Sequence, residues 1–122
     1  MVGEVVFRSA RTFHVIQFAL ARHSRVLLRS FPDSEDGSAI DFHSGADFLS
    51  LRPIYKGLEV RRATYEEGLY VRSTYDLNVD TEYIYFLAPG TSDFVAGGVP
   101  QWVEGHGLGD LPSIFGSFGG TL

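Results

Sequence analysis

The stretch EYIYFLAPGTSDFVAG, residues 82–97, decides the fold class. Its first half, residues 82–88, is rich in aromatic and β-branched side chains and is apolar on both faces of an extended chain, which is typical of a central strand. Residues 89–93 then supply proline, glycine, serine and aspartate, the residues of turns, and residues 94–97 return to an apolar run. We therefore predict a β-hairpin over residues 82–97 with a loop of four or five residues.

Three further segments alternate between apolar and polar residues with a period of two. In residues 40–43, Ile40 and Phe42 share one face of an extended chain, while Asp41 and His43 share the other. Residues 58–61 repeat this pattern after Gly57, a candidate turn or bulge, and residues 69–73 repeat it after a Glu-Gly pair. Each segment is predicted to form a strand.

The N-terminal region, residues 12–30, is open to two interpretations. Its apolar residues recur at offsets that suit an amphipathic helix, but they also suit two strands, 12–21 and 25–31, joined at residues 22–24. Periodicity does not separate these alternatives for short apolar runs. The β-branched and aromatic content favours strands, and so does the lack of helix-capping residues at either end.

Length and composition limit the architecture. The chain has 122 residues, 44% hydrophobic and 20% charged, with ten Phe, six Tyr and no Cys. We expect one all-β domain over residues 1–122: a compact antiparallel barrel or twisted sandwich of six to eight strands, with at most one short helix. Eight of the fourteen glycines lie between residues 97 and 122, so we expect a Gly-rich tail from about residue 105, mobile or draped over a sheet face.

Several of these segments together carry a resemblance. They are ARHSRVLLRS at 21–30, AIDF at 39–42, GLEV at 57–60, YIYFL at 83–87 and FVAG at 94–97. The combination resembles a class of small uncharacterised bacterial proteins in which a His-Ser-x-x-Leu-Leu-Leu-Arg-Ser-like strand precedes an Ile-Asp-x-x-Phe-like strand. This chain departs from that pattern at Val26, where leucine is commoner, and in the spacing at Asp41-Phe42. The resemblance implies strands over residues 12–30 and no known activity.

Charge is unevenly distributed along the chain. Residues 1–31 carry a net charge of +4, residues 73–122 carry −6, and the whole chain carries −5. This sign argues against nucleic acid as a partner, because nucleic-acid-binding domains present a basic surface. We expect the N-terminal arginines to face acidic segments of the same chain or of a second copy; they are Arg8, Arg11, Arg22, Arg25 and Arg29. No apolar run approaches the roughly 20 residues of a membrane span, so we expect no membrane partner and a cytoplasmic location.

The residue types that act in catalysis, metal binding and phosphate binding do not occur with the spacing of a known kind of site. His14, His23, His43 and His106 lack the spacing of a metal pair, and the adjacent His23 and Ser24 would point to opposite faces of a strand. The Gly-rich segment 105–110 has no lysine and no predicted helix after it, so it does not suit phosphate. We therefore expect no catalytic residue, no metal ligand and no cofactor.

Two hypotheses about function remain. The first is a non-catalytic protein-interaction or accessory protein, with self-association as one form of it and Arg25 and Arg29 as its interface candidates. Pairing between copies would bury sheet edges and surplus aromatics. Neutralising a basic toxin is a special case of this hypothesis. The alternative is a small-molecule-binding barrel, conceivably a weak enzyme, whose pocket is lined by Tyr83, Tyr85 and Trp102.

Overall fold

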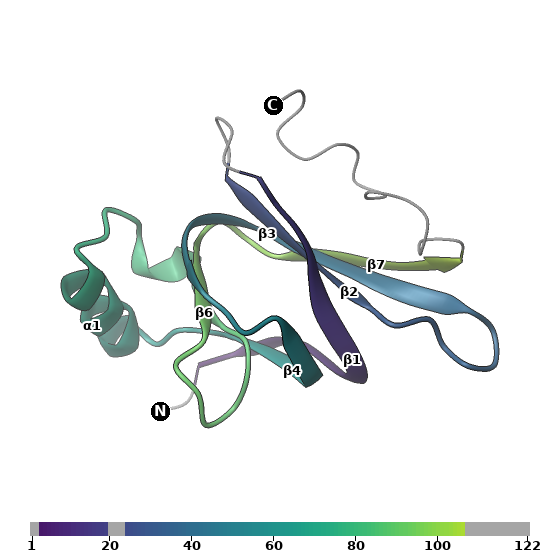
Figure 1. Cartoon of the computed structure of the whole chain (residues 1–122). Coiled ribbons are helices and arrows are strands. Elements are labelled where there is room, and N and C mark those ends of the chain that lie inside the picture. The colour runs from purple at the N-terminus through teal and green to yellow at the C-terminus, as the bar shows by residue number, and fades with distance from the viewer. Residues whose placement is uncertain (1–2, 20–23, 107–122) are drawn as a thin grey trace.

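The computed structural model describes residues 3–19 and 24–106, apart from the side chains of Gln17, Ala19 and His106. Within this part, seven strands, one helix and one 3₁₀ turn form a compact, mainly antiparallel β domain (Figure 1). Their bounds are β1 Val5–Ala19, β2 Arg25–Ser30, β3 Ser38–Ser50, β4 Ile54–Arg62, α1 Tyr65–Tyr75, η1 Thr81–Tyr83, β5 Ile84–Phe86, β6 Phe94–Gly97 and β7 Gln101–His106. The predicted all-β class with at most one short helix is confirmed. The expectation about the C-terminal tail falls on residues 107–122, outside the described residues.

The strands close into a ring. β1 pairs with β2 and β4, β3 pairs with β2 and β6, and β5 joins β4 to β6, with every pairing antiparallel. β6 and β7 follow one another along the same edge of β3, opposite residues 46–50 and 38–43 respectively. Because β1 and β3 each pair with neighbours along both edges, the sheet closes on itself, as in a barrel.

The hydrophobic core lies inside this ring. Alternate residues of the strands point inward and are fully buried, among them Phe13 of β1, Val26 and Leu28 of β2, Phe42 of β3 and Val60 of β4. For residues 12–30 the sequence allowed either a helix or two strands. Their described part lies in two strands, β1 and β2, as the aromatic and β-branched content predicted. Residues 20–23, which join them, are not described.

The predicted strand over residues 69–73 is wrong, because this segment lies in α1. Thr64 accepts a hydrogen bond from the Glu67 amide, and the Glu67 carboxylate accepts one from the Thr64 amide, which forms a capping box. At the other end, Asp76 adopts a left-handed conformation with φ of 54°, and its amide closes on the carbonyl of Arg72. These two caps outweigh the β propensity of the residues between them.

The predicted hairpin is present, but its first strand is shorter and its loop longer than expected. β5 and β6 pair through Ile84, Tyr85 and Phe86, while residues 81–83 form the 3₁₀ turn and the loop spans residues 87–93. Pro89 and Gly90 form a tight turn, since the Thr91 amide donates to the Ala88 carbonyl over 3.4 Å and Gly90 has a φ of 71°, but β6 begins only at Phe94. The hydroxyl of Tyr55 on β4 donates to the Asp93 carboxylate over 2.8 Å and ties the loop to the ring.

Helix α1 lies outside the ring, against β5 and β6 (Figure 1). Its buried residues are Gly68 and Val71, and Val71 joins a small second core with Ile84, Phe94 and Ala96. Gly68 permits close approach to the 3₁₀ turn, since a Cβ atom there would lie 2.5 Å from the Cβ of Thr81. No helix in the described residues is long and apolar enough to span a bilayer.

Candidate aromatic groove beside α1

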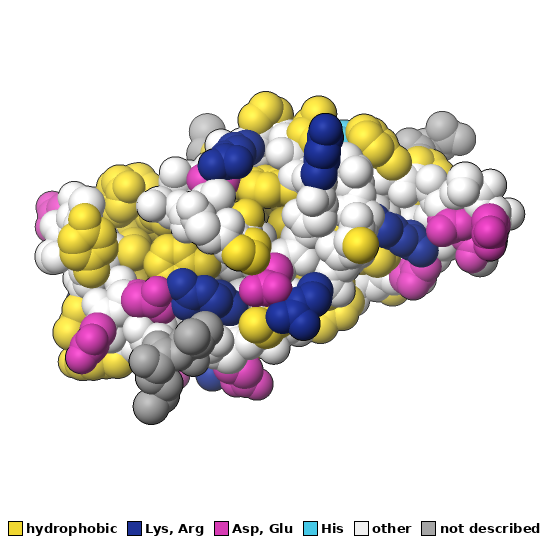
Figure 2. All heavy atoms as spheres, turned by 90° about the horizontal axis from the view of Figure 1, so that it is seen from below, with side chains coloured by type: hydrophobic (Ala, Val, Ile, Leu, Met, Phe, Trp, Pro, Cys, Tyr) yellow, Lys and Arg dark blue, Asp and Glu magenta, His cyan; other side chains and the backbone are white. Residues whose placement is uncertain are grey.

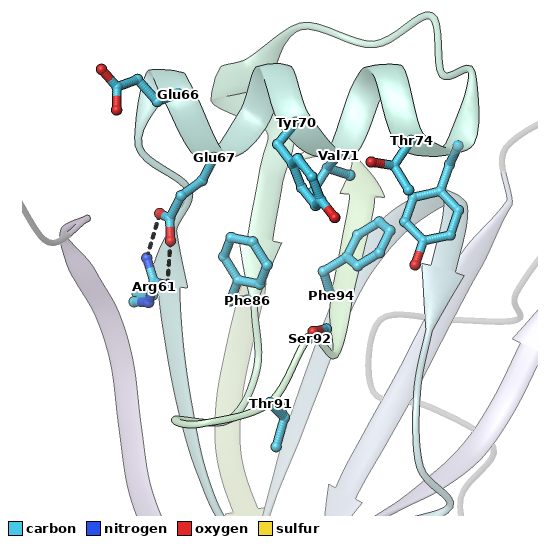
Figure 3. Close-up of a pocket in the computed structure, with 11 residues that line it drawn as sticks. Arg61, Glu66, Glu67, Tyr70, Val71, Thr74, Phe86, Thr91, Ser92 and Phe94 are labelled. Atoms are coloured by element: carbon cyan, nitrogen blue, oxygen red, sulfur yellow. Dashed lines mark hydrogen bonds and ion pairs between the residues drawn. The ribbon is translucent and has the colours of Figure 1, made fainter.

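A groove of about 490 Å³ separates α1 from the β5–β6 hairpin (Figure 3). Its lining comes from the end of β4, from α1 and from the hairpin: Arg61, Glu66, Glu67, Tyr70, Val71, Thr74, Tyr75, Phe86, Thr91, Ser92 and Phe94. Tyr70, Val71 and Thr74 point from the helix towards Phe86 and Phe94. The groove therefore depends on the position of the helix, which its caps and Gly68 fix.

The floor of the groove is aromatic. The Phe94 ring lies 5.6 Å from that of Phe48, 5.4 Å from that of Tyr75 and 6.3 Å from that of Phe86, measured between ring centroids. Phe48 and Tyr75 also contact one another at 4.8 Å. Because these rings pack on each other, they form one continuous apolar surface.

One side of the groove is an internal ion pair. Arg61 donates two hydrogen bonds to the Glu67 carboxylate, at 2.8 and 2.7 Å, and its guanidinium lies 4.7 Å from the centroid of the Phe86 ring. The hydrogen bonds from Arg61 hold the pKa of Glu67 at about 2, with help from the Thr64 amide. This pair fixes the wall of the groove, and Glu67 neutralises the positive charge of Arg61.

Helix α1 exposes several large apolar side chains, two of which line the groove. These two are Tyr70 and Tyr75, which are 70% and 41% exposed. Tyr65 and Leu69 are also exposed, at 69% and 41%, but they do not line the groove. Figure 2 shows hydrophobic side chains gathered at the α1 end of the molecule. Exposed aromatic side chains next to an apolar floor are typical of a binding site.

The surroundings of the groove are acidic. Residues 64–83, which contain α1 and the 3₁₀ turn, carry five acidic residues and one basic residue. Glu66 lines the groove and points away from the floor at the start of the helix (Figure 3). The groove thus offers aromatic contact area inside a negative field.

The tyrosines and the tryptophan predicted to line a pocket lie in different environments. Tyr85 is 1% exposed inside the ring, Tyr83 is in the 3₁₀ turn, and Trp102 on β7 packs on Phe42 and Phe7. None of the three lines the groove, whose aromatic residues are Tyr70, Tyr75, Phe86 and Phe94. The overlooked signal was Thr-x-x-Glu at 64–67, which places Tyr70 and Tyr75 on a helix instead of a strand.

The predicted interface arginines also differ in their surroundings. Arg29 is buried beside Asp41 on the neighbouring strand, with nitrogen–oxygen distances of 2.5 and 2.9 Å, so its side chain is not on the surface. Arg25 is partly buried at the start of β2. Arg11 pairs with Glu104 in the acidic segment 73–122, as expected, whereas Arg8 pairs with Glu59, which lies outside the acidic segments. Arg22 lies outside the described residues.

The histidines are dispersed. His14 stacks on Phe31 with a centroid distance of 4.7 Å, and His43 lies on β3, where burial is the main cause that lowers its pKa. His23 is not described, and neither is the side chain of His106. Within residues 3–19 and 24–106 no group of three His, Asp or Glu is placed to hold a metal ion. The geometry of the described site suits binding, through aromatic contact and a few polar groups.

No family model, no curated protein and no solved structure matches the chain, so its function is argued from this geometry.

Proposed function

We propose that this chain is a non-catalytic binding protein that docks a segment of a partner protein in the groove between α1 and the β5–β6 hairpin. The observation that carries the proposal is the exposed Tyr70 and Tyr75 beside a packed aromatic floor. Tyrosine is enriched at protein interfaces, and its two side-chain torsions make it inexpensive to order on binding. A partner side chain on the floor, surrounded by these residues, has the form of an interface hot spot.

Charge indicates the chemistry of the partner. Residues 64–83 together with Arg61, the ion-pair partner of Glu67, carry a net charge of −3. A partner segment that combines apolar side chains with lysine or arginine complements this surface, whereas an acidic segment would be repelled. The proposed partner is therefore a basic, amphipathic stretch of another protein.

A small aromatic molecule is the second candidate ligand. The volume of about 490 Å³ lies within the range of small-molecule pockets, and Thr74, Thr91 and Ser92 provide hydroxyl groups around an apolar floor. The open side of the groove, where Tyr70 is 70% exposed, favours a larger partner that covers more of this side chain.

Fluorescence anisotropy with labelled peptides tests the proposal. The probes are twelve-residue peptides that alternate lysine with leucine, lysine with serine, and glutamate with leucine. We expect the lysine–leucine peptide to bind best, and the Tyr70→Ala/Tyr75→Ala variant to bind it at least tenfold more weakly, as loss of two groove-lining tyrosines implies. Tyr83→Ala is the matched control, because Tyr83 is on the surface but does not line the groove.

Two results would contradict the proposal. One is that the double variant and the parent bind the lysine–leucine peptide equally well. The other is that the parent binds the lysine–serine peptide as tightly as the lysine–leucine peptide. If Tyr83→Ala weakens binding of the lysine–leucine peptide as much as the double variant does, the peptide binds at the 3₁₀ turn instead of the groove.

A further inference from the structure

A second hollow, of about 510 Å³, lies where the start of β2, the middle of β3 and the link between β6 and β7 meet. It is lined by Ser24, Arg25, His43, Gly45, Asp47, Gly97, Val99 and Gln101. It shares no residue with the aromatic groove and is mainly polar. An inference about this hollow is independent of the function proposed above.

Glycine packing preforms the hollow. Gly97 has a φ of 139°, and a Cβ atom there would lie 2.7 Å from the amide nitrogen of Asp47. A Cβ atom at Gly45 would lie 3.1 Å from the carbonyl oxygen of Gly97. The backbones of β3 and β6 therefore approach closely with no side chain between them, and this contact forms one wall of the hollow.

Arg25 is the positively charged residue of this hollow, and neither it nor Asp47 on the same hollow forms an ion pair with the described part of the chain. The Arg25 side chain is partly buried, and it forms no hydrogen bond with the described part of the chain either. Arg8, Arg11 and Arg29 each pair with a carboxylate instead. A guanidinium that is partly removed from water and lacks a counterion is poised to bind an anion, and its planar fork fits a carboxylate through two hydrogen bonds.

The neighbouring groups define the class of anion. Ser24 supplies a hydroxyl and Gln101 an amide, so hydrogen-bond donors surround the position that an anion beside Arg25 would take. The exposed Asp47 lies on the same hollow and disfavours a second negative charge. A singly charged carboxylate therefore suits the hollow better than a phosphate dianion.

We propose that this hollow is a carboxylate-binding site in which Arg25 is the charge partner and Ser24 and Gln101 are hydrogen-bond donors. The carboxylate belongs either to a free small acid or to the C-terminus of a peptide, two sources that present the same group.

His43 provides an internal reporter for the site. Burial is the largest cause that lowers its pKa, the charge of Arg25 lowers it further, and Gln101 and Asp41 raise it. A carboxylate bound beside Arg25 offsets the arginine charge, so it must raise the pKa of His43. The imidazole resonances of His43, followed by NMR against pH, therefore detect occupancy without a need for activity.

The experiment titrates the full chain with deuterated acetate that replaces chloride at constant ionic strength. We expect the pKa of His43 to rise with acetate, and Arg25→Gln to weaken acetate binding by about tenfold or more, as loss of a charge-assisted contact implies. Arg8→Gln, an exposed arginine of another ion pair, is the matched control and should respond as the parent does. A preserved amide NMR spectrum confirms that each variant is folded.

Two further probes identify the source and the charge preference. Triglycine with a free C-terminus, compared with triglycine amide, tests whether the carboxylate belongs to a peptide. If triglycine binds more tightly than acetate, the site takes a chain terminus. If triglycine binds as tightly as acetate or more weakly, the site takes a free acid. The proposal is overturned if the pKa of His43 does not respond to acetate, if Arg25→Gln responds as the parent does, or if phosphate dianion binds more tightly than acetate.

Discussion

Asparagine at position 41 should destabilise the domain strongly, because Asp41 is the counterion of the buried Arg29. The Arg29 side chain is 4% exposed and that of Asp41 is fully buried, and two hydrogen bonds join them. Asp41→Asn keeps the shape of the side chain but leaves the guanidinium charge without its carboxylate. Removal of one partner of a buried ion pair costs about 3–5 kcal/mol. For a domain of this length that corresponds to a fall in Tm of about 10–25 °C.

Urea unfolding followed by circular dichroism measures this loss directly. The matched control is Glu59→Gln, which breaks the ion pair with Arg8, where the two side chains are 66% and 28% exposed; it should cost at most about 1 kcal/mol. Replacing both buried partners, Arg29→Met with Asp41→Leu, should recover much of the stability, because no uncompensated charge remains. Equal free energies of unfolding for Asp41→Asn and Glu59→Gln would refute the reasoning.

Three further predictions concern the elements that position the groove. Glu67→Gln removes the ion pair with Arg61 and weakens the capping box, so it should lower the free energy of unfolding by about 1 kcal/mol near pH 7. The pKa of Glu67 is lowered from 4.5 to about 2, so the stabilisation by its carboxylate is complete above pH 4.5 and disappears as the pH falls towards 2. A difference in urea midpoint between variant and parent that persists below pH 2 would contradict this prediction. Gly68→Ala should destabilise the domain by about 1–3 kcal/mol despite the higher helix propensity of alanine, since its Cβ atom would collide with Thr81, and a raised Tm would show that the 3₁₀ turn moves freely. Phe13→Ala, which empties part of the ring interior, should cost about 3–5 kcal/mol in urea unfolding, whereas a cost below 1 kcal/mol would place Phe13 outside the core.

The strands were predictable where apolar and polar residues alternate along the sequence. Residues 40–43 and 58–61 show this clearly, and both lie within β3 and β4. Residues 69–73 alternate in the same way, yet they form a helix because Thr64 and Glu67 cap it just outside the alternating stretch. The error came from reading propensity without the flanking capping box, which was visible in the sequence.

The candidate site was less predictable, because it depends on which segments become neighbours. Tyr70 and Phe94 are 24 positions apart in the sequence, and only the packing of α1 on the hairpin brings them to one groove. Likewise, Arg29 lies on the polar side of an alternating strand, where a surface position was the natural expectation. Its burial follows from the register of β2 and β3, which places it directly opposite Asp41. A register of this kind is a property of the folded sheet and has no local signature.

The architecture separates the residues that stabilise the domain from those proposed to bind partners. The closed ring holds the main core and the buried Arg29–Asp41 pair, whereas α1 lies outside the ring and joins it through a small core around Val71. The outward side chains of α1, Tyr65 and Tyr70, retain about 70% of their exposure, so they contribute little to that core. A fold that needed these tyrosines for stability would bury them. Tyr70 is exposed beside an already packed aromatic floor, as the proposed docking of a partner in the groove requires.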